Sequence, residues 1–585
     1  MRRNRRITLA CAGAAVSIAL SACTGGAGGS AAAPAGPGYN AGVAKVVSPS
    51  SHAGGTLVLE NSGDWDSIDP GNTYYDYSWD FARLYTRTLT TYAPRPGRAG
   101  ERLVPDLATS LGQVSGNGLT WTYHLKPGIK LEDGETITAQ MIKYAIERTA
   151  SYSTVLPIGP VYFGTYLTDP AYPGAYRDST PGKMGLAGIS TPGPATIVFH
   201  LRKPMAEFDN LVSMPEAAPV PSAMDSGATY GQHPLSSGPY KIQSYLPGKQ
   251  LVLLKNPEWN PATDPVRKQL ASKIVVNLDV GAAGVDGRLL AGQADLDVEG
   301  TGAGPAAAAR ILRSPVLKSE SDDPVIDFGW YAAISTAVPP LNNLSCRQAV
   351  EYATNHAALQ NAYGGATGAE IAPSMLPPAI PGAQPRSYDP YEFLSKPGGD
   401  LKKARAALTA CGHPDGFTTA ISYPDNQPKE AAGAAALQAA LARAGIKASL
   451  FGYPSGQISS YAGAPAFVHQ HGLGINLYGW GPDWPSGFAY LYAISDGSAI
   501  LPAGNSNISE LNDPRVNSLL SAAMSTAGAP ARAAIYGQAD KLITQDAAFL
   551  PIVYARALLY RNPDVTNVYV NPALEMYDYS QMGVR

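Results

Sequence analysis

One stretch of the chain reads Gly474-Ile475-Asn476-Leu477-Tyr478-Gly479-Trp480-Gly481-Pro482-Asp483-Trp484-Pro485. Its apolar first half is typical of a strand, and the two prolines end that strand because proline lacks an amide donor and fixes φ. The turn therefore places Trp480, Asp483 and Trp484 at the end of a rigid element, where binding groups are common. A carboxylate between two indoles would attract a cation strongly. The alternative is a surface turn whose aromatic side chains only cover the core.

The segments around this stretch alternate between helix and strand. Helices are expected at residues 345–363, 400–412, 430–444, 513 onward and 530–548, with strands at 446–451 and 550–554. Ser345 and Gln348 form a capping box at the first of these helices, and Asp400 caps the second. Strands separated by helices predict a largely parallel α/β sheet in this half of the chain.

The first half of the chain is richer in loops and hairpins. Strands are expected at residues 55–60, 119–125, 196–201 and 274–278, and a helix at 78–89. The loop 61–77 holds Trp65, Tyr74, Tyr75 and Tyr77 among Asp, Asn and Gly residues. Each tyrosine joins apolar area to a hydrogen-bonding tip, and each could pack on the domain that carries it.

Length and charge narrow the class of protein. At 585 residues the chain is too long for one hydrophobic core, so two or three lobes are expected. Its 43 basic and 46 acidic residues nearly balance, which argues against nucleic acid as a partner. The sequence contains no Gly-x-Ser-x-Gly elbow, no His-Glu-x-x-His and no phosphate-binding loop that ends in Lys-Ser/Thr. We therefore expect no enzyme, no cofactor and no metal, although His469 and His471 would share one strand face.

The N-terminus has the layout of a secretion signal. A basic leader is followed by an apolar run to about Leu20, which is too short for a permanent membrane span. The next residues, Leu20-Ser21-Ala22-Cys23, match the lipobox of bacterial lipoproteins. This match predicts a signal peptide at 1–22, a lipidated Cys23 and a flexible Gly/Ala/Ser/Pro tether at 23–53. An ordinary signal with a chance cysteine is the alternative, and the arginine pairs leave a twin-arginine export route open.

The two later cysteines, Cys346 and Cys411, form an even pair in the oxidising compartment that such a signal implies. A disulfide between them would close a loop of about 65 residues, and the alternative is two buried free thiols. No later stretch reaches the length of a transmembrane helix. We therefore expect an extracytoplasmic protein held at the outer face of the membrane by its lipid.

Several short motifs follow one another in a fixed order. Pro105-Asp106-Leu107-Ala108 precedes the segment 119–130, Leu-Thr-Trp-Thr-Tyr-His-Leu-Lys-Pro-Gly-Ile-Lys, and Asp133-Gly134 follows it. Later come Ser237-Gly238-Pro239-Tyr240, Gly292-Gln293-Ala294-Asp295 and Arg347-Gln348-Ala349-Val350. In this order and spacing the chain resembles the extracellular solute-binding proteins of oligopeptide and dipeptide ABC importers, from Gly54 to the C-terminus.

The resemblance implies an α/β fold of the periplasmic-binding-protein type II kind, a two-lobed clamshell with an extra inserted domain. Carried over, lobe I comprises residues 54–92, 216–328 and 555–585, and the inserted domain comprises 93–215. Lobe II comprises residues 329–554. The ligand would lie between the lobes and be trapped when they close.

The resemblance also implies that Asp483 receives the α-ammonium of a peptide, whose main chain is then bound as an added strand. The other candidate ligand-binding residues are Trp480, Trp484, Tyr478, Asn476, Tyr74, Tyr75, Tyr77 and Trp330. Trp330 lies near a hinge crossing and could instead only pack the hinge. In the family, the residues around this aspartate are acidic and poor in proline, whereas here they are Trp-Pro-Ser-Gly. A non-peptide cationic ligand therefore stays an alternative.

We therefore expect a lipid-anchored receptor, monomeric by resemblance, that captures short peptides without breaking bonds. It would deliver them to an ABC permease that is served by a separate ATPase. The first alternative is the same fold with another solute, such as an oligosaccharide, a metal chelate or a siderophore-like compound. A secreted hydrolase or structural lipoprotein is the second.

Overall fold

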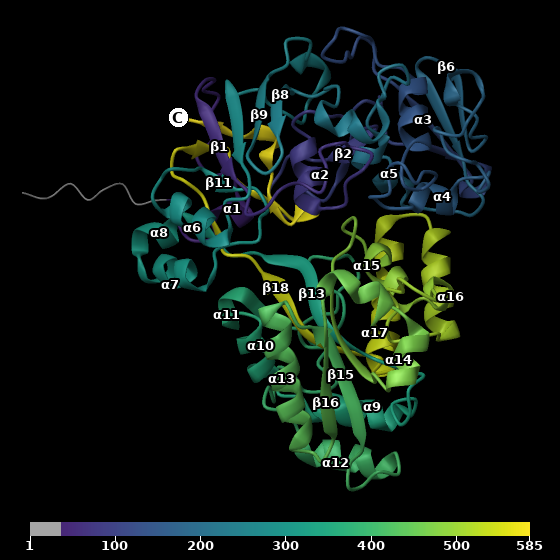
Figure 1. The fold of residues 1–585 in the computed structure, drawn as a ribbon, viewed down its shortest axis with the longest axis vertical. Helices are drawn as coiled ribbons and strands as arrows, with labels where there is room; N and C mark the ends of the chain where they lie inside the picture. Colours follow the sequence, from purple (N-terminus) through teal and green to yellow (C-terminus); the bar gives the residue numbers. More distant parts are fainter. Residues whose placement is uncertain (1–36) are drawn as a thin grey trace, which may run out of the picture.

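The computed structural model describes residues 37–585, which fold into two lobes stacked along the long axis of the molecule (Figure 1). The predicted signal peptide, Cys23 and the first part of the predicted tether lie outside the described residues. Within residues 37–585, no helix combines the length and the apolar character that a membrane crossing requires. The two-lobed α/β architecture is the one expected from the sequence.

The first lobe is built on a five-stranded sheet in the order β11 (Leu296–Asp297), β1 (Thr56–Glu60), β10 (Lys273–Asn277), β9 (Gln250–Lys255) and β8 (Tyr240–Leu246). β1 runs parallel to both of its neighbours, and β9 runs antiparallel to both of its own. Alternate residues such as Leu57 and Leu59 are fully buried, as one face of a strand should be. The helices of this lobe are α1 (Ala41–Ala44), α2 (Asp76–Ala82), α6 (Ala282–Leu290), α7 (Pro305–Arg313) and α8 (Pro315–Ser319).

Helix α2 is shorter than the helix expected at residues 78–89, because a run of β-branched threonines follows it and continues into β2 (Thr90–Tyr92). β2 pairs with β3 (Leu103–Pro105) in a small sheet. Three more two-stranded sheets complete the lobe: β12 (Ser321–Asp322) with β19 (Leu559–Tyr560), β20 (Val565–Thr566) with β23 (Gly583–Val584), and β21 (Val570–Asn571) with β22 (Met576–Tyr577).

A separate antiparallel sheet lies beside the first lobe, in the order β4 (Gln113–Ser115), β5 (Thr120–His124), β7 (Thr196–His200) and β6 (Ile189–Gly193). Trp121 and Tyr123 of β5 face the core with Ile197 and Phe199 of β7, which gives the alternation of a one-sided sheet. The helices of this part are α3 (Ala139–Glu147), α4 (Tyr162–Tyr166) and α5 (Phe208–Leu211). We refer to this part as the inserted domain.

The second lobe holds a six-stranded sheet in the order β14 (Ala369–Ile371), β18 (Phe549–Arg556), β13 (Val325–Ile334), β17 (Ile475–Trp480), β15 (Thr418–Pro424) and β16 (Lys447–Tyr453). β15 runs parallel to both β16 and β17, while the three pairings that involve β13 or β18 are antiparallel. The expectation of a largely parallel sheet is therefore wrong. The reason is that β13 and β18 come from the chain's passages between the lobes and not from strand–helix–strand units.

Helices cover this sheet: α9 (Leu344–Ala353), α10 (His356–Ala362), α11 (Gly365–Gly368), α12 (Leu401–Ala410), α13 (Pro428–Ala442), α14 (Pro465–His471), α15 (Gly487–Ser495), α16 (Pro514–Met524) and α17 (Ala529–Gln545). The helix expected at 345–363 is divided into α9 and α10, because Asn355 caps a new helix. Asn343, and not Ser345, caps α9. Asp400 and Asp513 cap α12 and α16 as expected.

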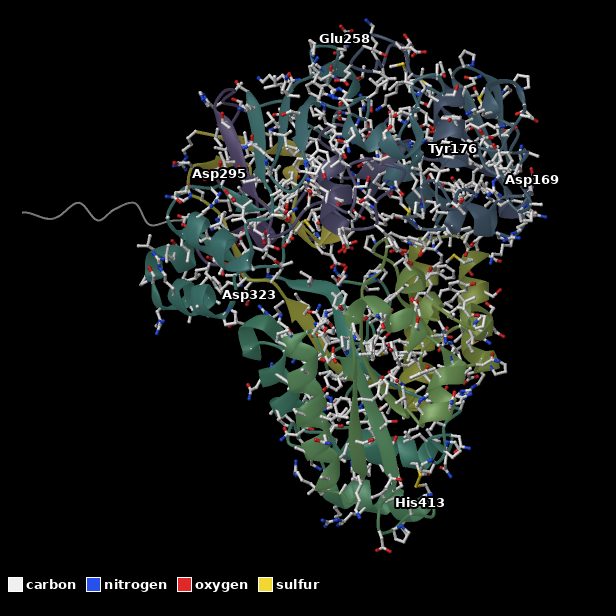
Figure 2. The ribbon with its side chains drawn as sticks, in the orientation of Figure 1. Asp169, Tyr176, Glu258, Asp295, Asp323 and His413 are labelled. Carbon is white, nitrogen blue, oxygen red and sulfur yellow. A yellow bond between two sulfur atoms is a disulfide. The ribbon has the colours of Figure 1, made fainter. Side chains whose placement is uncertain are left out.

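Two strands, β13 and β18, carry the chain between the lobes and lie side by side (Figure 1). Their antiparallel pairing is interrupted between Val325 and Gly329 and again between Trp330 and Tyr331. Asp323, which directly precedes β13, lies at the junction of the two lobes (Figure 2). Its carboxylate accepts a hydrogen bond from Arg556 Nε at 3.1 Å, which ties the ends of the two strands together.

Residues 37–50 pack on the first lobe, so the prediction of a flexible tether that extends to residue 53 is wrong for this part. The Asn40 amide donates to Ser321 O at 3.0 Å, and the Gly42 amide donates to Asp322 Oδ1 at 2.8 Å. Val47 is buried and pairs with Val568 in an isolated bridge. The Gly/Ala/Ser/Pro-rich composition of this segment gave no indication that a few of its residues anchor it to the first lobe.

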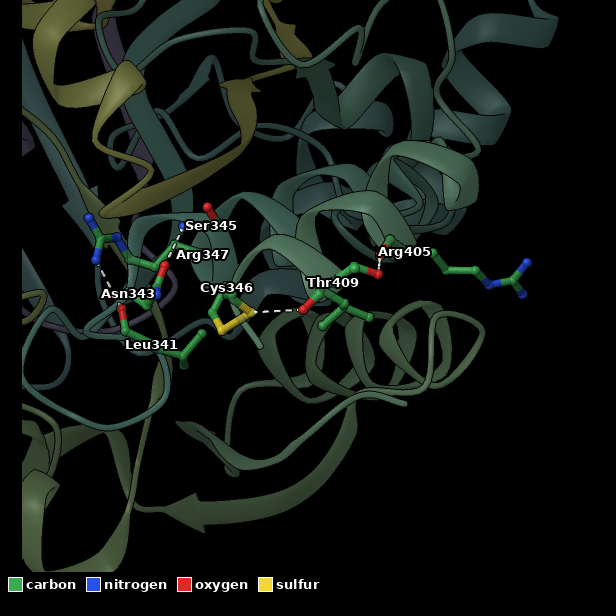
Figure 3. The surroundings of a disulfide bond; sticks show 9 residues. Leu341, Asn343, Ser345, Cys346, Arg347, Arg405 and Thr409 are labelled. Atoms are coloured by element: carbon green, nitrogen blue, oxygen red, sulfur yellow. Dashed lines mark hydrogen bonds between the residues drawn. A yellow bond between two sulfur atoms is a disulfide. The ribbon is translucent and has the colours of Figure 1, made fainter. Parts of the chain in front are cut away.

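A disulfide joins Cys346 of α9 to Cys411, the residue that ends α12 (Figure 3). The two Cα atoms lie 5.4 Å apart, and 65 positions separate the cysteines in the sequence. Cys346 is fully buried, so the bond fixes two helices of the second lobe from inside. The free-thiol alternative does not describe this structure.

Candidate functional site

A cavity of about 660 Å³ lies between the two lobes. The first lobe and the inserted domain supply most of its wall, and the second lobe supplies Pro482 and Asp483 from the turn after β17. The lining residues are Asp76, Trp79, Arg83, Thr86, Thr88, Thr91, Tyr92, Ser213, Met214, Pro215, Arg267, Pro482, Asp483, Ala573, Leu574 and Glu575. This volume includes space that is open to solvent. A cavity lined by aromatic, polar and charged side chains at a boundary between lobes is typical of a ligand site.

Local sequence explains how β17 delivers Asp483 to this cavity. A side chain at Gly479 would collide with Phe328 and Trp330 of β13, so glycine lets the two strands lie close together at this end. Pro482 then prevents further pairing. The carboxylate of Asp483 therefore projects from the end of a paired strand toward the opposite lobe.

Two tyrosines from the opposite side hold the Asp483 carboxylate. Tyr74 Oη donates a hydrogen bond to Asp483 Oδ2 at 3.1 Å, and Tyr162 Oη donates to the same oxygen. Burial raises the pKa of Asp483, while the hydrogen bonds from Tyr162 and Tyr74 lower it. Within residues 37–585 no side chain donates a hydrogen bond to Asp483 Oδ1, so this oxygen stays available to a ligand.

Further carboxylates continue from Asp483 along the space between the lobes, and we call Glu216, Asp483, Asp76, Glu575 and Asp327 the acidic row. Burial, and then the charge of Asp483, raise the pKa of Asp76 to about 7 and that of Glu216 well above its usual range. Burial, and then the charges of Asp76 and Asp327, raise the pKa of Glu575. Each member thus lies close enough to the next to oppose its ionisation.

The cations in the cavity wall do not neutralise this row, because each already has acidic partners. Arg83 pairs with Asp80 at 2.9 Å and with Asp578 at 3.1 Å. Arg267 pairs with Asp106 at 2.8 Å and with Asp264 at 3.2 Å. The acidic row is therefore left without a cationic partner from these two arginines.

The other predicted aromatic residues surround the turn and do not line the cavity. Trp480 stacks on Tyr478 with 6.3 Å between ring centroids, and its Nε1 is buried with no hydrogen-bond partner among the described residues. Trp330 packs on Tyr363 at 5.2 Å. Half-exposed Tyr75 stacks on Tyr77 at 5.4 Å. A contact of these side chains with ligand stays a prediction.

Three of the predicted ligand-binding side chains are engaged by the protein. Asn476 is fully buried; its Oδ1 accepts from Ser422 Oγ at 2.6 Å, and its Nδ2 donates to Leu473 O at 3.0 Å. Trp484 is 2% exposed and donates through Nε1 to Glu207 Oε2 at 2.7 Å. Tyr77 packs on Trp65 in the first lobe. Asn476 and Trp484 therefore have hydrogen-bond partners within the protein, and their contact with a ligand stays a prediction.

Trp484 takes part in a buried contact between the inserted domain and the second lobe. Glu207, just before α5, also accepts from Tyr536 Oη at 2.7 Å and lies 3.4 Å from Arg532 Nε. The neighbouring Ala206 amide donates to Met524 O at 2.9 Å. We call the group formed by Glu207, Trp484, Tyr536 and Arg532 the interlobe contact.

Sequence reasoning missed Tyr162, Asp76, Glu216, Glu575 and Glu207. Asp76 directly follows two predicted tyrosines, so its place in the same loop was a signal that could have been used. The others come from segments that are far from Asp483 in the sequence. Glu575 has a φ of 60°, a backbone conformation that is costly for a residue other than glycine. This indication of a functional residue is visible only in the structure.

The two histidines considered as metal ligands lie on helix α14, not on a strand. His469 Nε2 lies 2.7 Å from Glu510 Oε1, and His471 Nδ1 lies 3.0 Å from the carbonyl oxygen of Phe467. Within residues 37–585, no group of three or more His, Cys, Asp or Glu side chains is placed to hold a metal ion. A second cavity, of about 630 Å³ near α6 and α7, is lined by the first lobe alone, so lobe movement would not close it.

Comparison with known proteins identifies the architecture. The family model described as "Bacterial extracellular solute-binding proteins, family 5 Middle" matches residues 102–501. A solved structure named "Clavulanic acid biosynthesis oligopeptide binding protein 2" is 40% identical, with a TM-score of 0.90, covering 94% of this chain and 99% of that one. A periplasmic binding protein of Helicobacter pylori in complex with the peptide STSA is 22% identical, with a TM-score of 0.63 over 90% of this chain and 98% of its own, and shows the same fold.

Two curated relatives are similar in sequence over most of their length. The probable D,D-dipeptide-binding periplasmic protein of Escherichia coli (strain K12) is 24% identical over 533 residues, which are 89% of this chain and 92% of that protein. The glutathione-binding protein of Salmonella typhi is 24% identical over 483 residues, which are 78% of this chain and 82% of that protein.

Proposed function

The chain belongs to the bacterial extracellular solute-binding proteins of family 5, and from this premise we propose that it captures short peptides between its lobes and delivers them to an ABC permease. The relatives' names support a peptide as the ligand, since they specify an oligopeptide, a D,D-dipeptide and glutathione. The permease would be served by a separate ATPase, since this sequence has no phosphate-binding loop.

The position of Asp483 is the observation that carries the proposal. It is the acidic group that the second lobe contributes to the cavity wall, and tyrosines from the first lobe and the inserted domain shelter it. A sheltered carboxylate with one free oxygen is suited to a primary ammonium, because a charge-assisted hydrogen bond is strongest where water is excluded. The same contact would fix the direction in which a peptide lies.

We further propose that the protein is a monomer that works outside the cytoplasm, anchored through a lipid on Cys23, and that it releases its ligand chemically unchanged. The lipobox Leu20-Ser21-Ala22-Cys23 supports the anchor. The family's role as binding proteins supports the absence of catalysis. Capture would then consist of binding and lobe closure alone.

Native mass spectrometry of the full chain, purified from cells in detergent, tests the class of ligand. A ladder of bound masses that corresponds to short peptides is expected. A single sugar, metal chelate or other non-peptide solute would overturn the peptide assignment while keeping the binding fold. Turnover of a bound peptide into fragments would overturn the non-enzymatic role.

Calorimetry with the variant Asp483→Asn tests the site. Loss of the carboxylate should weaken binding of a tripeptide by about 2–5 kcal/mol, because the ammonium stays buried without its charged partner. Asp415→Asn is the matched control: Asp415 is exposed and follows His413, which lies at the tip of the second lobe farthest from the first (Figure 2). Unchanged affinity in Asp483→Asn would remove Asp483 from the proposed site.

A further inference from the structure

We propose that the preferred ligand is a peptide with a second positive charge, on a basic side chain that the acidic row receives, in addition to the N-terminal ammonium at Asp483. This inference rests on the proposed function, because it specifies the class of peptide. It follows from the carboxyl groups that line the cavity and from the absence of cationic partners for them among the described residues.

Three members of the acidic row line the same cavity and come from distant parts of the chain. Asp76 begins α2 of the first lobe, Glu575 follows a short turn near the C-terminus, and Asp483 belongs to the second lobe. A Cβ atom built on Gly481 would lie 3.8 Å from Glu575 Oε1, so Glu575 faces the turn that carries Asp483. The row therefore crosses the boundary between the lobes.

The flanking members are buried without compensation. Glu216 is 2% exposed, and neither of its carboxylate oxygens has a hydrogen-bond partner among the described residues. Its neighbour Pro215 lines the cavity. Asp327 is 3% exposed, and burial, and then the charge of Glu101, raise its pKa well above its usual range. Buried carboxylates without partners are costly, so a cation that joins them gains strongly.

A single ammonium at Asp483 would leave the other carboxyl groups of the row without a cationic partner. Arg83 and Arg267, the cations of the cavity wall, are already bound by two carboxylates each. A metal ion does not fit, because within residues 37–585 the carboxylates do not converge on one point. A row of separated carboxylates instead matches a flexible organic ligand whose positive charges are also separated.

A peptide with one lysine or arginine side chain meets this requirement. Its ammonium pairs with Asp483, while the basic side chain reaches Asp76 and Glu575 within the same cavity. Because those two carboxylates come from the first lobe and Asp483 from the second, such a ligand bridges the lobes by charge. An acidic side chain at the same place would be repelled.

Isothermal titration calorimetry at pH 7 on the full chain, freed of bound ligand by dialysis, tests the inference. The probes are Ala-Ala-Ala, three tripeptides in which one alanine is replaced by lysine at each position in turn, and Ala-Glu-Ala. We expect at least one lysine peptide to bind tenfold or more tightly than Ala-Ala-Ala, and Ala-Glu-Ala to bind more weakly. In the double variant Asp76→Asn/Glu575→Gln the affinity of the best lysine peptide, divided by that of Ala-Ala-Ala, should fall below threefold. In the control Asp415→Asn this ratio should remain tenfold or more.

Two results would overturn the inference alone: equal affinity for lysine peptides and Ala-Ala-Ala, or a lysine advantage that survives in the double variant. Both leave peptide binding itself intact. Failure of every peptide to bind, with correct folding shown by circular dichroism, would overturn the proposed function and this inference with it.

Discussion

Replacement of Glu207 by alanine should weaken ligand binding from outside the ligand cavity. Glu207 accepts hydrogen bonds from Trp484 Nε1 and Tyr536 Oη, each at 2.7 Å, and is 7% exposed. Alanine would leave both donors buried and unpaired, and it would also remove the neighbour of Arg532. Glutamine is the matched control. Its oxygen can serve the indole, which only donates, while its NH₂ group can donate to the tyrosine hydroxyl.

The size of the effect follows from the cost of unpaired buried donors. Each costs about 1–3 kcal/mol, so the alanine variant should lose roughly 2–6 kcal/mol from the contact between the inserted domain and the second lobe. Separation of the lobes would let water reach both donors, so the variant should favour the open arrangement. If ligand is held only when the lobes meet, its apparent dissociation constant should rise by about 30-fold or more. The glutamine variant should lose less than about tenfold, because it loses charge but no hydrogen bond.

Calorimetry gives the affinities, and small-angle X-ray scattering of the ligand-free protein gives the overall size. We expect Glu207→Ala to be larger in solution than the unchanged protein and Glu207→Gln to match it. An alanine variant that binds peptide within threefold of the unchanged protein would refute the reasoning, since the interlobe contact would then contribute nothing to closure.

Two further predictions concern stability. The folded state raises the pKa of Asp76 to about 7, so between about pH 4 and pH 7 the folded protein holds a proton that the unfolded chain has released. The free energy of unfolding of the ligand-free protein should therefore fall as pH rises through this range. Urea denaturation at pH 5 and pH 8 should show this fall to be smaller in Asp76→Asn; an identical fall would contradict it. Replacement of both Cys346 and Cys411 by alanine should lower the free energy of unfolding by about 4 kcal/mol, given their separation of 65 positions. A loss below about 1 kcal/mol in denaturant titrations would show that the loop is already constrained without the bond.

Local sequence signals predicted where helices and strands lie better than they predicted how the strands pair in sheets. Asp400 and Asp513 each start a helix because their carboxylates accept from the first backbone amides, a contact that lies within three residues. The direction of β13 and β18 depends on passages between lobes that are more than 200 residues apart, and no local pattern encodes it. Asn40 and Val47 similarly gain their anchoring role only from Ser321 and Val568, which are distant in sequence.

The prediction of the candidate site from sequence was limited in the same way. The proline-broken turn was sufficient to single out Asp483, because the residues that expose it are its own neighbours. Trp484 lies next to it in sequence and yet turns away from the cavity, because Glu207 of the inserted domain accepts its indole N–H. The acidic row could not be predicted, since its members are scattered from Asp76 to Glu575 and are united only by the way the lobes face each other.

The paired strands β13 and β18 restrict how the halves of the molecule can move. A two-stranded ribbon bends easily out of its own plane, whereas sliding one strand along the other would break its ladder of backbone hydrogen bonds. The ladder is already interrupted between Val325 and Gly329, so flexure should concentrate there. The lobes should accordingly rotate about this point without sliding past each other. The same residues of the two cavity walls should therefore face each other each time the lobes close.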